Sequence, residues 1–306
     1  MEISLVTGAN GFMGQALCQH LRKKGIQVRG SVRTLEYFKA GEDISVVGHL
    51  SAQTDWTQAL AGVNTIYHLA GTVHQPEITD STIYRETIAD ASLHLAQQAY
   101  AAGVQRLVYV SSAHVYSNSQ LPMTEESVKN PLTVYGKAKL AAEEALMQFA
   151  QQSNWDIVIV RPPLVYGNGV KANFKNLVNL IKKSMVLPLG CASAKRSFVG
   201  IHNLQSFLHL CGTDAKARNQ IFNITDDEDV SVAELCQIIK EIVKKKSYLL
   251  AVPNAWMKMV LKIVGKTDVY EKLFEASQLD INHAKKTLNW KPILTVRDEL
   301  ENVLRD

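Results

Sequence analysis

Short apolar runs alternate with longer segments of helical periodicity over the first half of the chain. The apolar runs predict buried strands at residues 3–7, 27–32, 45–50, 65–69, 108–112 and 157–161. The segments between them predict helices at residues 15–24, 56–61, 84–102 and 135–152. Strands and helices that alternate in this way are typical of an α/β fold with a doubly wound parallel sheet, the Rossmann architecture.

The pattern changes after Pro163, where loops and shorter elements replace the regular alternation. A last strand is predicted at 221–224, and helices are predicted at 173–183, 203–212, 254–264, 268–276 and 296–304. Ser231 and Glu234 form a capping-box pattern that begins another helix. We expect a Rossmann domain of residues 1–165, joined by about 198–226; its ligand follows from a motif described below. We expect the remainder to form a smaller C-terminal substrate lobe, from residues 166–197 and 227–306.

Composition and charge narrow the class of protein. Of 306 residues, 46% are hydrophobic and 20% are charged, as in ordinary globular proteins, and the net charge is +4. No long basic run indicates a nucleic-acid partner. The four cysteines are scattered without metal-ligand spacing, so we expect reduced thiols and no metal site. A strand begins at residue 3 and no apolar run matches a membrane span, so we expect a cytoplasmic protein without a signal peptide.

One late segment allows two interpretations. Residues 255–264 are apolar but are interrupted by Lys258 and Lys262. We interpret this segment as an amphipathic helix that faces the core, with membrane contact as the weaker alternative.

Three glycines follow the first predicted strand at a spacing of three, Gly8-x-x-Gly11-x-x-Gly14, with Phe12 and Met13 between the last two. A strand, a glycine turn and a helix form the context of a dinucleotide-binding fingerprint, although the usual spacing is GxGxxG. Glycines let the backbone approach a diphosphate, and the helix N-terminus offers N–H groups. The motif therefore predicts a nicotinamide dinucleotide site.

The end of the second strand bears on the choice of cofactor. NAD-binding chains usually carry an acidic residue there, which binds the ribose hydroxyls. Here Val32 and Arg33 occupy the place. An arginine would pair with the 2′-phosphate of NADP, so Arg33, helped by Arg29, favours NADP(H), with NAD(H) possible. The alternative is that Arg33 is simply solvated.

A tyrosine and a lysine four residues apart, Tyr135 and Lys139, lie on one face of a predicted helix. A nearby lysine cation favours the phenolate and would lower the pKa of the tyrosine toward neutral pH. Ser112 ends an upstream strand and could hold a substrate oxygen beside Tyr135. The three residues suit proton transfer at an alcohol or carbonyl oxygen. An isolated YxxxK pattern can equally be a solvated helix face.

With these motifs in this order, the chain resembles the extended short-chain dehydrogenase/reductases of the NAD-dependent epimerase/dehydratase family, of the nucleotide-sugar epimerase and reductase type. The resemblance covers nearly the whole length. Besides the glycine motif and Tyr135-x-x-x-Lys139, it rests on the stretches at 68–70, 111–116, 161–167, 196–199 and 288–292.

The resemblance implies roles for individual residues. Ser112, Tyr135 and Lys139 would be catalytic, and Lys139 would also bind the nicotinamide ribose. Asn173 and Arg196 match positions that bind the nucleoside diphosphate of the substrate. Asn173 could instead cap its helix, and Arg196 could be an ordinary ion-pair partner. The implied cofactor site extends to His49, Leu50, Leu69, Ala70, Gly71 and Pro162.

Three departures from the family pattern concern the cofactor and its surroundings. The acidic residue after the second strand is missing, His49 replaces the usual aspartate, and Ile88 stands where an asparagine is common. No carboxylate pair accompanies His114, which makes a sugar dehydratase the weakest of the family's reactions.

The family's other reactions remain open from the sequence. Arg33 favours an NADPH-dependent reductase of a UDP- or dTDP-linked 4-keto-6-deoxyhexose, for surface-polysaccharide precursors. The alternative is a 4-epimerase of UDP-glucose or UDP-N-acetylglucosamine with tightly bound NAD. A cofactor-sensing regulator is disfavoured because all three catalytic residues are present. Family members commonly pair the helices at 84–102 and 134–152 in a dimer, so we expect a homodimer.

Overall fold

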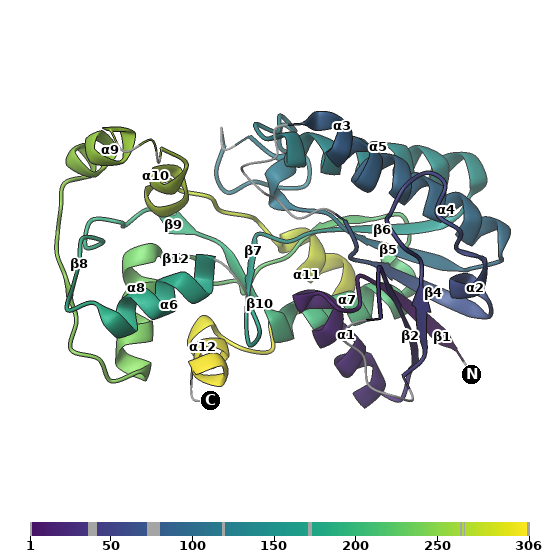
Figure 1. The fold of residues 1–306 in the computed structure, drawn as a ribbon, viewed down its shortest axis with the longest axis horizontal. Coiled ribbons are helices and arrows are strands. Elements are labelled where there is room, and N and C mark those ends of the chain that lie inside the picture. The colour runs from purple at the N-terminus through teal and green to yellow at the C-terminus, as the bar shows by residue number, and fades with distance from the viewer. Residues whose placement is uncertain are drawn as a thin grey trace.

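A seven-stranded parallel sheet forms the centre of the larger domain (Figure 1). The computed structural model describes residues 2–35, 42–71, 80–117, 120–170, 173–263, 265 and 267–304. The strand order is β11-β6-β5-β4-β1-β2-β3. The strands are β1 (Ile3–Thr7), β2 (Gln27–Val32), β3 (Ile44–Val46), β4 (Val63–His68), β5 (Arg106–Val110), β6 (Asp156–Arg161) and β11 (Ile221–Asn223). Each neighbouring pair is parallel, so the prediction of a Rossmann sheet is confirmed.

Helices cover both faces of this sheet. Figure 1 shows α4 (Ala91–Ala101) and α5 (Val134–Ser153) above it, with α1 (Phe12–Lys23) and α7 (Ile201–Thr213) below. Alternate residues of each strand point to opposite faces. In β5, Val108 belongs to the core between the sheet and helices α1 and α7, whereas Leu107 belongs to the core between the sheet and helices α4 and α5. Both faces are therefore buried, as a parallel sheet requires.

Shorter elements connect the larger ones. In the larger domain they are α2 (Thr57–Leu60), α3 (Ser81–Tyr84), the π-helical turn η1 (Arg85–Asp90), the 3-10 turns η2 (Ala113–Val115) and η3 (Ala215–Ala217), and α11 (Asn282–Leu288). Two three-residue strands, β7 (Leu164–Tyr166) and β10 (Phe198–Gly200), pair with each other where the chain passes between the domain and the lobe.

The smaller lobe has its own hydrophobic core. Its helices are α6 (Asn173–Lys183), α8 (Val232–Ile242), α9 (Asn254–Ile263), α10 (Thr267–Phe274) and α12 (Val296–Leu304). Two short ribbons complete it, β8 (Val186–Leu187) with β13 (Tyr248–Leu249), and β9 (Lys195–Arg196) with β12 (Val230–Ser231). The predicted capping box is present, because Ser231 accepts from the amide of Glu234 and Glu234 accepts from the amide of Ser231.

Two sequence predictions about local structure were wrong. The third strand was expected at 45–50, but β3 is Ile44–Val46, and Gly48 at φ +69° turns the chain beyond it. The helix at 254–264 was expected to face the core. None of the described residues of α9 is buried, because only Met257 reaches the edge of the small-lobe core.

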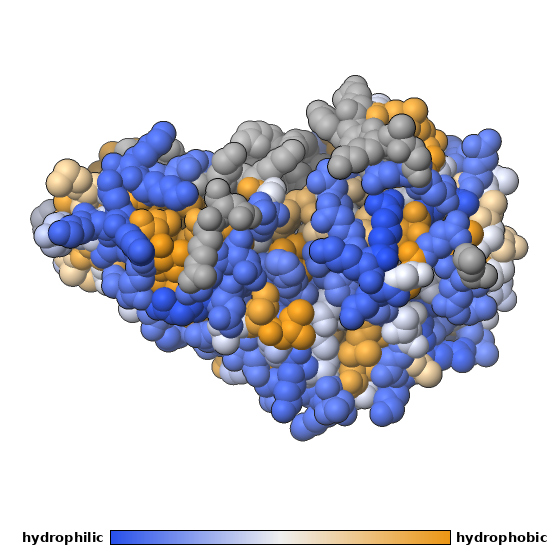
Figure 2. Space-filling model, turned by 90° about the horizontal axis from the view of Figure 1, so that it is seen from below, coloured by the Kyte–Doolittle hydropathy of each residue, from blue (hydrophilic) through white to orange (hydrophobic). Residues whose placement is uncertain are grey.

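The surface also bears on the membrane question. The face of the molecule seen from below is mostly hydrophilic, with separate small apolar patches (Figure 2). Within the described part of the chain, no helix is both long and apolar enough to cross a membrane.

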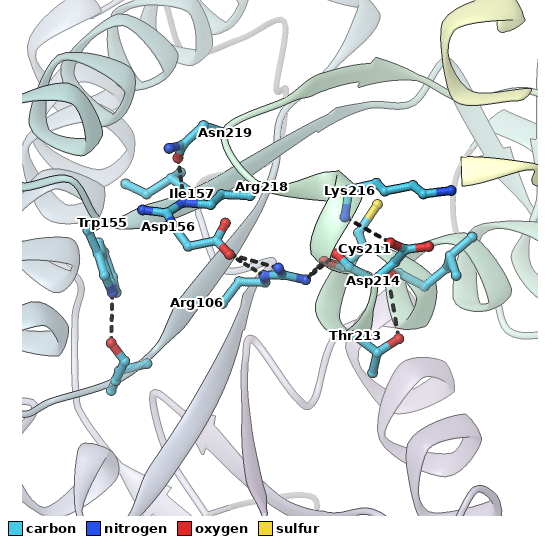
Figure 3. A network of polar contacts seen from close by, with 12 residues as sticks. Arg106, Trp155, Asp156, Ile157, Cys211, Thr213, Asp214, Lys216, Arg218 and Asn219 are labelled. Carbon is cyan, nitrogen blue, oxygen red and sulfur yellow. Dashed lines mark hydrogen bonds and ion pairs between the residues drawn. The ribbon is translucent and has the colours of Figure 1, made fainter. Parts of the chain in front are cut away.

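A polar network fixes the amino-terminal edge of the sheet (Figure 3). Arg106, at the start of β5, donates from Nε to Asp156 on β6 at 2.8 Å. Its Nη1 donates to the carbonyls of Cys211 and Asp214 at the end of α7, at 2.8 and 2.9 Å. One guanidinium thus joins two strands to a helix C-terminus, whose carbonyl groups lack helical partners.

A second buried arginine lies at the opposite, carboxyl edge of the sheet. Arg161 ends β6 and donates from Nε to both carboxylate oxygens of Glu143 on α5, at 3.0 and 3.1 Å. Its Nη1 donates to the hydroxyl of Tyr116 at 2.7 Å, and that hydroxyl donates to Asn223 of β11 at 2.7 Å. Arg161 and Glu143 are almost completely buried. The pair therefore fixes α5 to the sheet.

We expect Glu143→Gln to lower the free energy of unfolding by about 3–5 kcal/mol, because it leaves a buried guanidinium without its counter-charge. Chemical denaturation would measure this. The matched control is Glu144→Gln on the neighbouring, exposed position, which should change stability by less than about 0.5 kcal/mol. Equal stabilities of the two variants would contradict the role assigned to the pair.

Candidate active site

The glycine turn after β1 brings three segments of backbone close together. Gly8 has φ +67°, and a Cβ there would lie 3.1 Å from the Cα of Ala70 after β4. A Cβ on Gly14 would lie 2.1 Å from the carbonyl oxygen of Gly8. Gly11 caps α1 without any side-chain hydrogen bond. The turn thus has no side chain at its three glycine positions beside an uncapped helix N-terminus, which fits the diphosphate of a dinucleotide.

Arg29 in β2 and Arg33 just after it have different surroundings. Arg33 is exposed just after the strand, and no ion pair or hydrogen bond to it is found among the described residues. Arg29 instead donates to both carboxylate oxygens of Asp43, at 3.0 and 3.1 Å, and to the carbonyl of Ala61 at 2.8 Å. Because Arg29 is held at the end of α2, the expectation that it helps to bind a 2′-phosphate was wrong.

The other residues predicted around the cofactor lie after strands at the same edge of the sheet. His49 is exposed and Leu50 half-buried in the loop after β3. Leu69, Ala70 and Gly71 follow β4, and Pro162 follows β6, where its carbonyl accepts from the amide of Ala113 at 2.9 Å. Phe12 and Met13 begin α1 and pack against the core.

A buried hydrogen-bond chain runs behind this edge, and no sequence motif predicts it. The Thr7 hydroxyl accepts from the amides of Leu69 and Ala70 at 3.1 and 3.0 Å. Its own proton must therefore go to His68 Nδ1, 2.7 Å away. His68 is then the Nε2–H tautomer, which donates to Ser92 Oγ at 2.9 Å. Ser92 in turn donates to the carbonyl of Ile88, so the chain has one direction.

Local packing on η2 positions Tyr135. The hydroxyl of Thr133 caps α5 by accepting from the amide of Gly136 at 3.0 Å. A Cβ on Gly136 would lie 2.3 Å from the carbonyl oxygen of His114, so only glycine lets α5 approach this turn so closely. Tyr135 is brought close to Ser112 as a result, near enough for the serine hydroxyl to influence its pKa. The Tyr135 ring also meets the His114 ring edge-on, at 5.7 Å between centroids.

The Ser112 hydroxyl has a hydrogen-bond partner in His114. The Ser112 hydroxyl lies 2.9 Å from Nδ1 of the His114 ring, and it accepts from the His114 amide at 3.2 Å. From the sequence, His114 bears only on the dehydratase reaction. The structure places it instead as a partner of the predicted substrate-binding hydroxyl.

Lys139 lies in the interior, one turn beyond Tyr135. Its Nζ donates to the carbonyl of Val110 at 2.9 Å and lies 4.7 Å from the centroid of the Tyr109 ring. Burial lowers the pKa of Lys139 to about 8, although Glu143 opposes this. The Lys139 Nζ is 6.0 Å from the centroid of the Tyr135 ring.

Burial, rather than Lys139, dominates the ionisation of Tyr135. It raises the pKa of Tyr135 to about 12, while the nearby Ser112 hydroxyl lowers it in part. The expectation that Lys139 brings this pKa toward neutrality is therefore not met by the protein groups alone. Ser112, which caps η2, nevertheless lies at the same edge of the sheet as Tyr135 and Lys139 of α5. Their catalytic roles stay a prediction.

The two residues predicted to bind a nucleoside diphosphate belong to the smaller lobe. Arg196 is half-buried on β9, where its guanidinium donates to the carbonyl of Glu275, and burial lowers its pKa. Asn173 begins α6, but its side chain lies outside the described part of the structure. Their contact with substrate stays a prediction. Among the described residues, no cluster of His, Cys, Asp and Glu could hold a metal ion.

Comparison with known proteins bears on this site. The model of the NAD dependent epimerase/dehydratase family matches residues 4–225. A UDP-glucose 4-epimerase of Vibrio cholerae is 35% identical over 301 residues, which cover 96% of this chain and 92% of that protein.

Solved structures show the same fold at lower identity. The UDP-N-acetylglucosamine 4-epimerase from Bacillus cereus superposes with a TM-score of 0.83 at 19% identity, covering 99% of this chain and 98% of the other. MoeE5 in complex with UDP-glucuronic acid and NAD gives a TM-score of 0.79 at 22% identity, covering 100% and 98%.

We expect His68 to make stability depend on pH. Burial lowers the pKa of His68 from 6.5 to about 3, so below pH 6.5 the unfolded chain binds a proton that the folded protein excludes. Stability therefore falls as the pH falls from 6.5 toward 3, by up to about 1.4 kcal/mol per pH unit from this residue. The free energy of unfolding of His68→Gln, measured with denaturant between pH 4 and 7, should decrease less with falling pH than that of the wild type.

Ser92→Ala is the control for this measurement. It removes a hydrogen bond without removing a titratable group. It should therefore lower the free energy of unfolding by about 1 kcal/mol at every pH and leave its dependence on pH unchanged. If the stability of His68→Gln depended on pH as steeply as that of the wild type, His68 would not be the source of the pH dependence.

Proposed function

We propose, from the premise that the chain belongs to the NAD-dependent epimerase/dehydratase family, that it is a nucleotide-sugar 4-epimerase acting on a UDP-hexose with tightly bound NAD. The observation that carries the proposal is the close approach of Ser112 to Tyr135, with Lys139 one turn away on the same helix. The 35% identical relative is itself a UDP-glucose 4-epimerase, which supports this reaction over the reductase that the sequence favoured. UDP-glucose and UDP-N-acetylglucosamine are the first substrates to test.

The proposed mechanism assigns one role to each residue. Tyr135 takes the proton of the C4 hydroxyl and returns it to the C4 oxygen when the opposite epimer forms. Ser112 donates a hydrogen bond to that oxygen as charge develops on it. Lys139, as a cation, favours the Tyr135 phenolate against the effect of burial. Bound NAD would supply a reversible hydride acceptor, held by the glycine turn, Lys139 and the residues that follow β3, β4 and β6.

A reductase of a nucleotide-linked 4-keto sugar is the second candidate, and one observation favours it. Arg33 is exposed where an acidic residue would bind the ribose of NAD, and a guanidinium there suits the 2′-phosphate of NADP. A reductase must release its cofactor after each turnover, whereas an epimerase retains it. Either activity would supply precursors for surface polysaccharide, and we propose a homodimer through α4 and α5 for both.

Tyr135→Phe should reduce kcat roughly 10²–10⁴-fold, because the variant lacks the group that exchanges the proton. Conversion of UDP-glucose to UDP-galactose would measure this. The matched control is Tyr248→Phe, an exposed tyrosine on β13 that lies outside the site and outside α4 and α5, which should retain wild-type turnover. Full activity in Tyr135→Phe would refute the assignment, whereas loss of turnover with cofactor retained would also exclude a purely regulatory protein.

Cofactor content separates the two candidates. The epimerase account predicts NAD in the purified protein at close to one per chain, and unchanged NAD affinity in Arg33→Asn. A protein purified without cofactor that binds NADPH at least roughly tenfold better than NADH would instead support the reductase. In that case Arg33→Asn should abolish the preference. A tenfold preference corresponds to about 1.4 kcal/mol of binding free energy.

A further inference from the structure

The outer end of the smaller lobe carries large apolar side chains in water. On α9, Trp256 and Ile263 are 69% and 73% exposed, and Met259 and Val260 are also more than half exposed. These residues are spaced i, i+3, i+4 and i+7, so they form one stripe along the helix. An exposed stripe of this kind on a globular protein marks an interaction surface.

The neighbouring ribbon extends this stripe. Tyr248 of β13 pairs with Val186 of β8, and both side chains are exposed, whereas Leu187 and Leu249 turn into the small-lobe core. Only four residues separate the end of β13 from the start of α9. Figure 1 shows α9 and β8 at the same end of the molecule, the end farthest from the sheet.

The charges around the stripe indicate what it contacts. Residues 242–267 contain six lysines and no Asp or Glu. Lys262 is exposed and flanks the stripe beside Met259. Lys258 lies on the opposite side of α9, where its Nζ is 5.5 Å from the centroid of the Tyr270 ring. On α6, Lys182 and Lys183 are exposed just before Met185, which is itself exposed beside the ribbon. The nearest acidic side chain on α8, Glu241, is already paired with Arg297.

We propose that this outer face, formed by α9 and the β8–β13 ribbon, binds the surface of an anionic lipid bilayer. A tryptophan and long apolar side chains enter the interface between headgroups and acyl chains, while lysines extend toward the anionic headgroups. The helix lies in the plane of the membrane and does not cross it. The face belongs to different elements from α4 and α5, so it is independent of the proposed dimer and of the proposed reaction.

The chain contains its own probe of this contact. Of the four tryptophans, Trp56, Trp155 and Trp290 are 0–5% exposed and only Trp256 is in water. We would mix the full-length protein with vesicles of phosphatidylcholine, alone or with phosphatidylglycerol, and record tryptophan emission and co-sedimentation. The proposal predicts a blue shift and binding to the anionic vesicles, at least roughly tenfold weaker with neutral vesicles or in high salt.

Variants assign the binding to α9. Trp256→Glu/Ile263→Glu should reduce binding to anionic vesicles at least roughly tenfold, because it places two carboxylates in the contact. The matched control is Ile293→Glu, which changes an exposed isoleucine outside this face and should bind as wild type does. Sedimentation of each protein without lipid reports any change of oligomeric state.

Three results would overturn the proposal. The first is the absence of binding to anionic vesicles, and the second is binding that survives in Trp256→Glu/Ile263→Glu. The third is a dimer that dissociates in that double variant, together with no vesicle binding, because the face would then be a contact between copies of the chain. The epimerase assay is separate, so failure here leaves the proposed reaction untouched.

Discussion

The buried ion pair between Arg161 and Glu143 is the interaction on which the active-site region depends. It joins the last residue of β6 to the helix that carries Tyr135 and Lys139. Through Tyr116 and Asn223 the same guanidinium reaches the outermost strand of the sheet. Because two buried charges are stable only when they face each other, the position of α5 relative to the sheet is narrowly defined.

Glu143 also connects this pair to the chemistry. It lies one turn beyond Lys139, and its charge partly offsets the burial that lowers the pKa of Lys139. Tyr135 experiences the opposing effect, since burial raises its pKa and disfavours the phenolate. The site is buried, which strengthens each electrostatic contact within it. Few charged groups of the protein favour the phenolate form of Tyr135.

The sequence predicted what depends on local spacing. The doubly wound sheet, the glycine turn and the convergence of Ser112 with Tyr135 all follow from periodicity and from strand ends that meet at one edge. It could not predict contacts between distant segments. Arg29 donates to a carbonyl at the end of α2, and His68 is hydrogen-bonded between Thr7 and Ser92. Helix α9 lacks the contact with the core that its apolar pattern indicated. Each depends on tertiary packing that apolar spacing alone does not encode.

Transfer of deuterium tests the central claim most directly. The protein would be incubated with UDP-glucose deuterated at C4, without added cofactor, and the C4 epimer analysed by mass spectrometry. The account predicts UDP-galactose that retains the deuterium, because the hydride leaves and returns within one active site. Product that has lost the deuterium, or no conversion until a reduced cofactor and a 4-keto sugar are supplied, would contradict it.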